Sequence, residues 1–244
     1  MGATKIEFRL RMAIMAVIIT LGFWSPWIQI WGIGERIPLL EWLALELHRM
    51  GLVPFAVASP AVILAATVVA AVGVVLRVWG TAYLGTGRVH HGQMQAGAVL
   101  ADGPFRYVRN PLYLGTWCMV AAMAFLMPVT GALFAVVLET AFLLRLILGE
   151  EAFLTSQLGE PYREYLHTVP RLLPRLRSTL KTTGVKPRWL HAVLAEVNPI
   201  GVFLILAVMS WGYDNDLMVR AIIVSFGLSL VMRAPTMGTR QKAD

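Results

Sequence analysis

The stretch GPFRYVRNPLYLG, residues 103–115, places residues that can bind a charged ligand directly before a long apolar run. It contains two arginines, three aromatic residues and two prolines. A guanidinium group can hold a carboxylate through paired hydrogen bonds, and an aromatic ring can lie beside a cation. Arg106 and Arg109 fit equally well as charges that end a membrane segment, with Tyr107 and Tyr113 as interfacial belt aromatics. Taken alone, the stretch leaves both interpretations open.

A second group of polar residues follows the next apolar run. Glu150 and Glu151 are adjacent acids, which alone are typical of a helix start that faces water. The stretch LGEPYREYLHTVPRLLP then covers residues 158–174. Gly159 is typical of a helix end and Pro161 of the next helix start, so we expect Tyr162 and Tyr165 to share one face of a short helix.

One carboxylate falls inside an apolar run. Glu139 lies in the middle of residues 130–148, where an ionisable group costs roughly 2.5–3.5 kcal/mol. Such a group is a functional candidate by default. Pairing with Arg145 or with Arg220 is an equally good structural explanation.

Composition indicates the setting of these residues. Apolar residues make up 57% of the 244-residue chain and charged residues 14%, with a mean hydropathy of +0.67. These values are typical of an integral membrane protein. Cys118 is the single cysteine, so the sequence predicts neither a disulfide framework nor a metal-binding cysteine cluster, and we expect no metal.

The elements that must position these residues are membrane helices. Residues 36–50 alternate apolar and charged residues at helical spacing, which predicts an amphipathic helix in the membrane interface. No run alternates with the period of a strand, so the predicted fold class is all-α, a polytopic transmembrane helical bundle. Six apolar runs are predicted to span the membrane: 10–31, 54–80, 111–127, 130–148, 191–212 and 217–232.

Basic residues indicate the orientation of the spans. With both termini in the cytoplasm, 18 of the 21 lysines and arginines fall on the inner side, and only Arg36 and Arg49 fall outside. Arg220 lies within the last span. The basic residues flank spans and form no separate basic domain, so we expect membrane lipids and no nucleic acid as partners.

Three blocks in order resemble a known family. GPFRYVRNPLYLG, the acidic pair at 150–151 and LGEPYREYLHTVPRLLP closely resemble the isoprenylcysteine carboxyl methyltransferase family and its relatives, the membrane phosphatidylethanolamine N-methyltransferases. The resemblance covers about residues 97–174. It implies S-adenosylmethionine as methyl donor, S-adenosylhomocysteine as product, and a pocket at the cytoplasmic membrane face.

Most motif positions match that family, and a few depart from it. Phe105 stands where the family has Tyr, and Asn110 where it has His, while Gly97 replaces an expected His with His90 and His91 nearby. An Asn can imitate one hydrogen-bonding nitrogen of imidazole but cannot titrate near neutral pH. The predicted donor-binding residues, all but Arg106 suggested by the resemblance and Arg106 by its charge, are Gly103, Pro104, Arg106, Arg109, Asn110, Pro111, Tyr113, Gly115, Glu150, Glu151, Tyr162 and Tyr165.

The chemistry of the donor fits these residue types. An arginine can hold the donor's carboxylate, an acid its ammonium or ribose hydroxyls, and tyrosines can lie beside sulfonium and adenine. No strand followed by a glycine-rich turn and an acid is present, so the sequence predicts no Rossmann-type donor domain. The predicted catalytic residues are Glu151, Arg109 and Asn110, with Glu151 as the candidate proton acceptor.

The acceptor is predicted to be lipophilic and to reach the site from the bilayer. Asn110 in place of a titratable His favours carboxyl O-methylation of an isoprenoid-type molecule, because a carboxylate needs no proton removed. Phospholipid amine N-methylation is the alternative. A transporter or scaffold is the rival class, but the spans hold few charges and no inverted repeat of broken helices.

The sequence also predicts an organisation in three segments. Residues 1–90 hold the N-terminal spans, 91–190 the methyltransferase core and 191–244 a two-span extension. We expect a multi-pass membrane protein whose site faces the cytoplasm, in the inner membrane if the protein is bacterial. The pattern does not indicate an oligomeric state.

Overall fold

The structure is helical throughout the part of the chain that it describes. This computed structural model describes residues 2–84, 101–182, 184–209 and 214–238. Within these ranges no strand is present beyond an isolated bridge of Pro38 with Pro128, so the all-α prediction is confirmed there. The helices are α1 (Lys5–Arg9), α2 (Arg11–Trp24), α3 (Pro26–Trp31), α4 (Leu39–Arg49), α5 (Phe55–Leu84), the 3₁₀ turn η1 (Gly103–Arg106), α7 (Pro111–Ala124), α8 (Val129–Leu158), α9 (Glu160–Thr168), α10 (Trp189–Ala195), α11 (Val197–Met209) and α12 (Asn215–Gly238).

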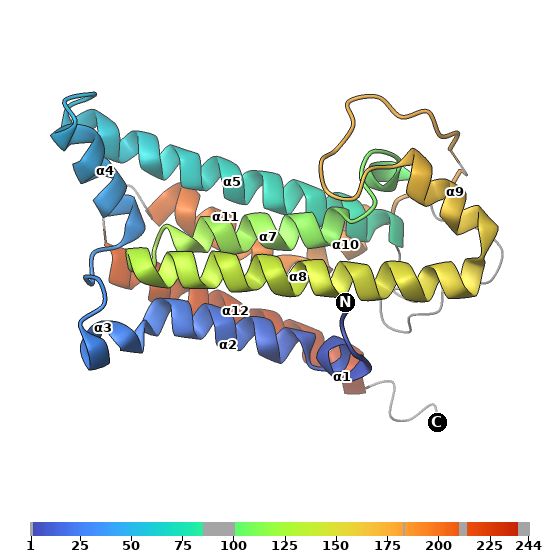
Figure 1. Ribbon diagram of the computed structural model, residues 1–244, viewed down its shortest axis with the longest axis horizontal. Coiled ribbons are helices and arrows are strands. Elements are labelled where there is room, and N and C mark those ends of the chain that lie inside the picture. The colour runs from blue at the N-terminus through green and yellow to red at the C-terminus, as the bar shows by residue number, and fades with distance from the viewer. Residues whose placement is uncertain (1, 85–100, 183, 210–213, 239–244) are drawn as a thin grey trace.

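The long helices run roughly side by side and form an elongated bundle (Figure 1). Helices α2, α5, α7 and α8 lie toward the viewer, with α11 and α12 behind them. Helices α3 and α4 lie at one end of the bundle, whereas α1, α9 and η1 lie at the other. The sequence motifs are therefore gathered at a single end.

The predicted spans coincide with helices, but not all of these helices have the length of a span. Helices α5 and α8 each have 30 residues and are long and apolar enough to cross a membrane. Helices α10 and α11 qualify together as one span bent by 71°. Helices α2 and α7 are apolar but have 14 residues each. Two helices, or three with the bent pair, thus qualify by length and composition among the described residues.

The predicted amphipathic segment forms α4. Leu40 and Ala44, four residues apart, are both buried on one face of the helix. Exposed Arg49 pairs with Glu46 on the other side at 2.8 Å. This helix packs against α5 and so closes the end of the bundle opposite the motifs.

Close helix packing sets the position of α7 against α5. A Cβ atom added to Gly115 on α7 would lie 2.9 Å from the carbonyl oxygen of Gly73 on α5 and 2.6 Å from Cγ of Arg77. Small residues of this kind allow two membrane helices to approach closely. Gly115 is therefore a packing position that fixes the helix on which the first motif ends.

Glu139 is fully buried on α8, and neither of its carboxyl oxygens has a hydrogen-bond partner among the described residues. The two structural pairings considered for it are wrong. Arg145 instead binds Glu7 on α1, at 2.8 Å, and Arg220 is exposed on α12. Ala135 and Phe142, four residues before Glu139 and three after it, belong to the apolar cluster that includes Ile18 of α2.

Candidate functional site

The first motif folds into a turn followed by a helix start. Gly103 has φ +57°, and a Cβ atom there would overlap the ring of Tyr83, so both backbone and space require glycine. Pro104 is buried in η1. Pro111 occupies the first turn of α7, where its missing N–H costs nothing. The Asn110 carbonyl accepts the first backbone bond of α7, from Leu114 at 3.0 Å.

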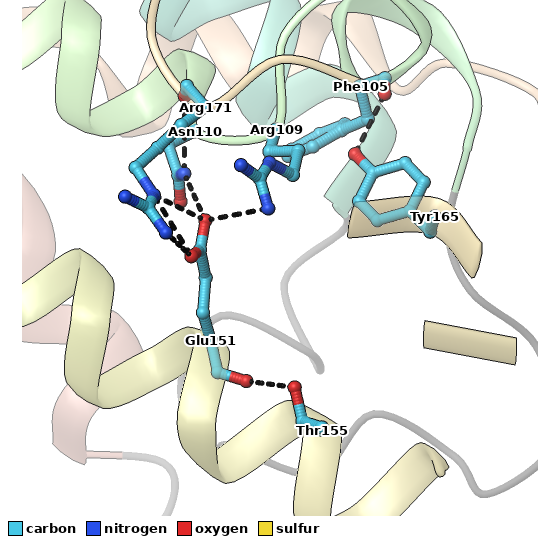
Figure 2. Close-up of polar contacts among 7 residues, drawn as sticks. All are labelled: Phe105, Arg109, Asn110, Glu151, Thr155, Tyr165 and Arg171. Atoms are coloured by element: carbon cyan, nitrogen blue, oxygen red, sulfur yellow. Dashed lines mark hydrogen bonds and ion pairs between the residues drawn. The ribbon is translucent and has the colours of Figure 1, made fainter. Parts of the chain in front are cut away.

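Glu151 is the centre of a polar network that joins three separate segments (Figure 2). Its carboxylate is buried and accepts bonds from Arg171 Nη2 at 2.8 Å and Nε at 3.0 Å. Arg109 Nη1 lies 3.4 Å from the other carboxylate oxygen, Oε1. Asn110 Nδ2 donates to that same oxygen at 3.2 Å. The structure thus brings the three predicted catalytic residues into contact.

Asn110 connects the network to the chain that follows α9. Besides Glu151, its Nδ2 group donates to the backbone carbonyl of Arg171 at 3.3 Å. The backbone N–H of Arg109 donates to the Pro170 carbonyl at 2.9 Å. An amide can make both donations through its two N–H bonds. Residues 170 and 171 are therefore held directly over the start of α7.

Arg171 is a member of the network that the sequence motifs did not predict. In the sequence it is one of several basic residues after α9, which predicted only the inner membrane side. The available signal was its position directly after the tyrosine block, in VPRLLP. Spacing could not single it out because Arg175 and Arg177 follow within six residues.

Arg106 does not join the network. Its guanidinium donates from Nε at 3.1 Å and from Nη2 at 2.5 Å to the carbonyl of Leu180. Of the two motif arginines, the structure therefore places only Arg109 against Glu151. Arg106 instead secures the chain segment after α9.

The two predicted tyrosines of α9 share a buried face, as expected from their spacing. Tyr162 and Tyr165 have ring centroids 5.7 Å apart. The Tyr165 hydroxyl donates to the Phe105 carbonyl at 2.8 Å, which ties α9 to η1 (Figure 2). Burial raises the pKa of both tyrosines, so both remain protonated donors. Gly159, at φ +62°, makes the turn between α8 and α9.

Glu150 and Glu151 face different partners although they are adjacent. Consecutive residues of a helix point about 100° apart. Glu150 interacts with the Tyr113 hydroxyl on α7, with Arg11 of α2 nearby. The acidic pair therefore holds α7 at two points, through Tyr113 and through Asn110.

One buried donor in the network has no partner. Nε of Arg109 makes no hydrogen bond within the described ranges and is inaccessible to solvent. A buried guanidinium N–H without an acceptor is costly and normally finds one. Arg109 can thus accept an anionic group while it keeps its contact with Glu151. The residues present fit the carboxylate of an amino acid ligand.

Three residues named with the motif resemblance, His90, His91 and Gly97, lie outside the described residues. No group of three or more His, Cys, Asp or Glu side chains that could hold a metal ion is found among those that are described.

Part of this helical chain is similar to a known methyltransferase family. Residues 61–160 match the family of phospholipid methyltransferases, a stretch that includes most of α5, the first motif, α7, α8 and Glu151. The resemblance predicted from the three motif blocks is confirmed for this part of the chain. No solved structure matches the chain.

A relative is similar to part of the chain. The methanethiol S-methyltransferase of Crocosphaera subtropica (strain ATCC 51142 / BH68) is 41% identical over 70 residues. The match covers 29% of this chain and 27% of that relative. The aligned region therefore spans about a quarter of the relative's length.

Proposed function

We propose that this protein is an integral membrane methyltransferase that transfers a methyl group from S-adenosylmethionine to a lipophilic acceptor. The observation that carries the proposal is the network around Glu151. It draws Arg109 and Asn110 of the first motif and Arg171 after the tyrosine block onto the buried carboxylate of Glu151. The family match supports methyl transfer as the reaction class.

The residues of the cluster divide the recognition of the donor between them. We assign the donor's carboxylate to Arg109, whose Nε has no acceptor among the described residues, and to the half-exposed guanidinium of Arg171. We assign Glu150 to the ammonium or the ribose hydroxyls. Tyr113 and Tyr162 offer rings beside the sulfonium and adenine. When bound, the donor supplies a methyl group on a cationic sulfur.

The protein's contribution to the reaction is mainly positioning. Methyl transfer is an in-line displacement, and alignment of acceptor, methyl and sulfur contributes several kcal/mol of effective molarity, up to about 7–11 kcal/mol in the best cases. The loop that carries the site is stiffened by Pro104 and Pro111, both buried. Asn110 holds the start of α7 to the segment after α9 and so fixes the geometry of the pocket wall.

Proton demand favours an acceptor that is already an anion. Both oxygens of Glu151 already accept bonds from positively charged or amide groups, so we assign this carboxylate the role of holding those groups in place. Asn110 carries no group that can take up a proton. We therefore propose carboxyl O-methylation of an isoprenoid-type or similar lipophilic acid. A carboxylate is ionised well below neutral pH, since its reference pKa is about 4.

A thiol acceptor is the second candidate, favoured by the partial match to a methanethiol S-methyltransferase. A thiol of the cysteine type has a reference pKa of about 8.5, so a small reactive thiolate fraction is present at neutral pH without a protein base. A phospholipid amine, to which the matching family's name points, needs a proton acceptor and is the remaining alternative.

We further propose that six helical segments span the membrane, with both chain ends and the site on the cytoplasmic side. Support comes from α1, α9 and the end of α12, which lie at one end of the bundle (Figure 1). The basic residues of the sequence concentrate in segments at this end. The division into segments 1–90, 91–190 and 191–244 stays a prediction.

Calorimetry with S-adenosylhomocysteine on detergent-purified protein tests donor binding. Binding is expected, and its absence would favour a transporter or scaffold. Labelled donor with a membrane lipid extract, and separately with a long-chain thiol, then tests the acceptor. A product that releases volatile methanol under base is a methyl ester. A base-stable labelled phospholipid, formed at a rate that rises with pH, would instead identify an amine acceptor, and a labelled thioether the thiol.

A further inference from the structure

The segment between α9 and α10 forms a strap across the first motif. The strap comprises residues 170–182 and 184–188, and it arches away from the bundle at the end where α9 lies (Figure 1). Its sequence contains six lysines and arginines and no acid. Arg171 is the residue of the strap that takes part in the proposed donor site, and that site gives the rest of the strap no role.

One edge of the strap is fixed to the motif loop along its length. The Arg175 N–H donates to the Tyr107 carbonyl at 3.0 Å, and the Leu180 carbonyl accepts from Arg106. Further along, the Val185 N–H donates to Asp102 Oδ2 at 3.0 Å. These bonds come mostly from the backbone, so they leave the strap side chains free to face outward.

The other edge exposes leucines and cations together. Leu173 is 83% exposed and Leu176 98% exposed. Transfer of a leucine side chain out of water is favourable, so exposure of both is unusual. The side chains of Arg175 and Arg177, which alternate with them, form no ion pair in the part of the chain that the structure describes. Exposed apolar side chains interleaved with cations are typical of segments that lie on an anionic lipid surface.

The position of the strap along the bundle suits contact with lipid headgroups. Helices α5 and α8 have 30 residues and are about 45 Å long at ~1.5 Å per residue, whereas the hydrocarbon core is ~30 Å thick. Their ends therefore reach through the headgroup layer. The strap meets α5 near its end, where the Arg188 N–H donates to the Ala82 carbonyl at 2.8 Å. Next to it, Trp189 is half exposed, as interfacial tryptophans are.

We propose that the outer edge of the strap docks on the anionic headgroups of the membrane in which the protein is embedded. Arg175 and Arg177 pair with lipid phosphates, and Leu173 and Leu176 insert among the upper acyl chains. The proposal requires only that the chain is embedded in a membrane. It does not depend on the methyl-transfer reaction.

Hydrogen–deuterium exchange of the full-length protein in lipid nanodiscs tests this docking. The strap is compared in discs of phosphatidylcholine alone and in discs that also contain phosphatidylglycerol. We expect its backbone amides to exchange about tenfold more slowly with the anionic lipid, and the difference to shrink at high salt because screening weakens the contact. Equal exchange in the two kinds of disc would overturn the proposal, whatever the variants do.

Paired variants identify the side chains responsible. Arg175→Gln with Arg177→Gln, and separately Leu173→Ser with Leu176→Ser, should each remove most of the protection. Arg163→Gln, an exposed arginine on α9, should leave it unchanged. Protection that survives both double variants, or that Arg163→Gln removes equally, contradicts the assignment. Protection by short RNA in phosphatidylcholine discs would assign the strap to nucleic acid instead.

Discussion

The guanidinium of Arg77 on α5 pairs with the carboxylate of Glu196 at 2.6 Å, across 119 residues of sequence. Glu196 lies at the break between α10 and α11, where the chain bends by 71°. Its second oxygen accepts from the Thr81 hydroxyl at 2.7 Å. Arg77 also donates to Thr116 on α7 at 2.6 Å. One ion pair thus joins the C-terminal helices to the two helices that support the motif.

Loss of this pair should destabilise the protein strongly. Glu196→Gln leaves the Arg77 charge without a counterion in a largely buried position, which costs about 3–5 kcal/mol when one partner of a buried pair is removed. Glu46→Gln, which breaks the exposed pair with Arg49, is the matched control and should cost under about 1 kcal/mol. Thermal unfolding in detergent measures both. Equal stability of the two variants would mean that the buried pair is energetically neutral.

The second prediction concerns the Glu151 network. Arg109→Lys removes the planar fork and its free Nε, and Glu151→Ala leaves Arg109 and Arg171 without their shared partner. Each should weaken binding of S-adenosylhomocysteine at least about tenfold, or ~1.4 kcal/mol, without loss of monodispersity. Calorimetry is the measurement. Arg106→Lys, whose parent side chain binds the Leu180 carbonyl, should bind within about threefold of the parent, under ~0.7 kcal/mol. Unchanged binding by both network variants would remove the site from this cluster.

Asn110 should act through its hydrogen bonds rather than its size. Asn110→His can still donate one N–H to Glu151 and should keep much of the activity, whereas Asn110→Leu leaves that oxygen with fewer donors and should lose most of it. Methyl transfer from labelled donor gives the comparison. A fully active Leu variant would show that the position only fills space.

The pair of Glu7 and Arg145 predicts a stability change at acid pH. The Arg145 guanidinium, together with the Thr4 backbone and hydroxyl, lowers the pKa of Glu7 from 4.5 to about 2. A lowered folded-state pKa means that the ionised form contributes stability above about pH 4.5 and that this contribution disappears as the pH falls toward about 2. Melting temperatures of the parent and of Glu7→Gln should therefore differ at pH 6 and converge toward pH 2. A difference that is constant with pH would exclude the ionised pair as its source.

Much of the fold follows from local sequence patterns. Length and hydropathy alone predicted helices at α5 and α8, and helical alternation predicted α4. The start of α9 followed from Pro161, and the break after α8 from Gly159. Six spans remain a prediction, because α2 and α7 are short and the α10–α11 pair is bent.

The sequence by itself determined that the chain is helical and membrane-like, and it identified the motif blocks that carry Arg109, Asn110 and Glu151. These properties depend on residues close together in the chain, whose periodicity and capping act over a few turns. Only the tertiary structure decided that Arg171 joins Glu151 while Arg106 turns to Leu180, and that Glu139 finds no partner among the described residues. Arginines of equal charge and similar spacing are indistinguishable along the chain. Their partners are chosen by the packing of helices that bring distant residues within a few ångströms.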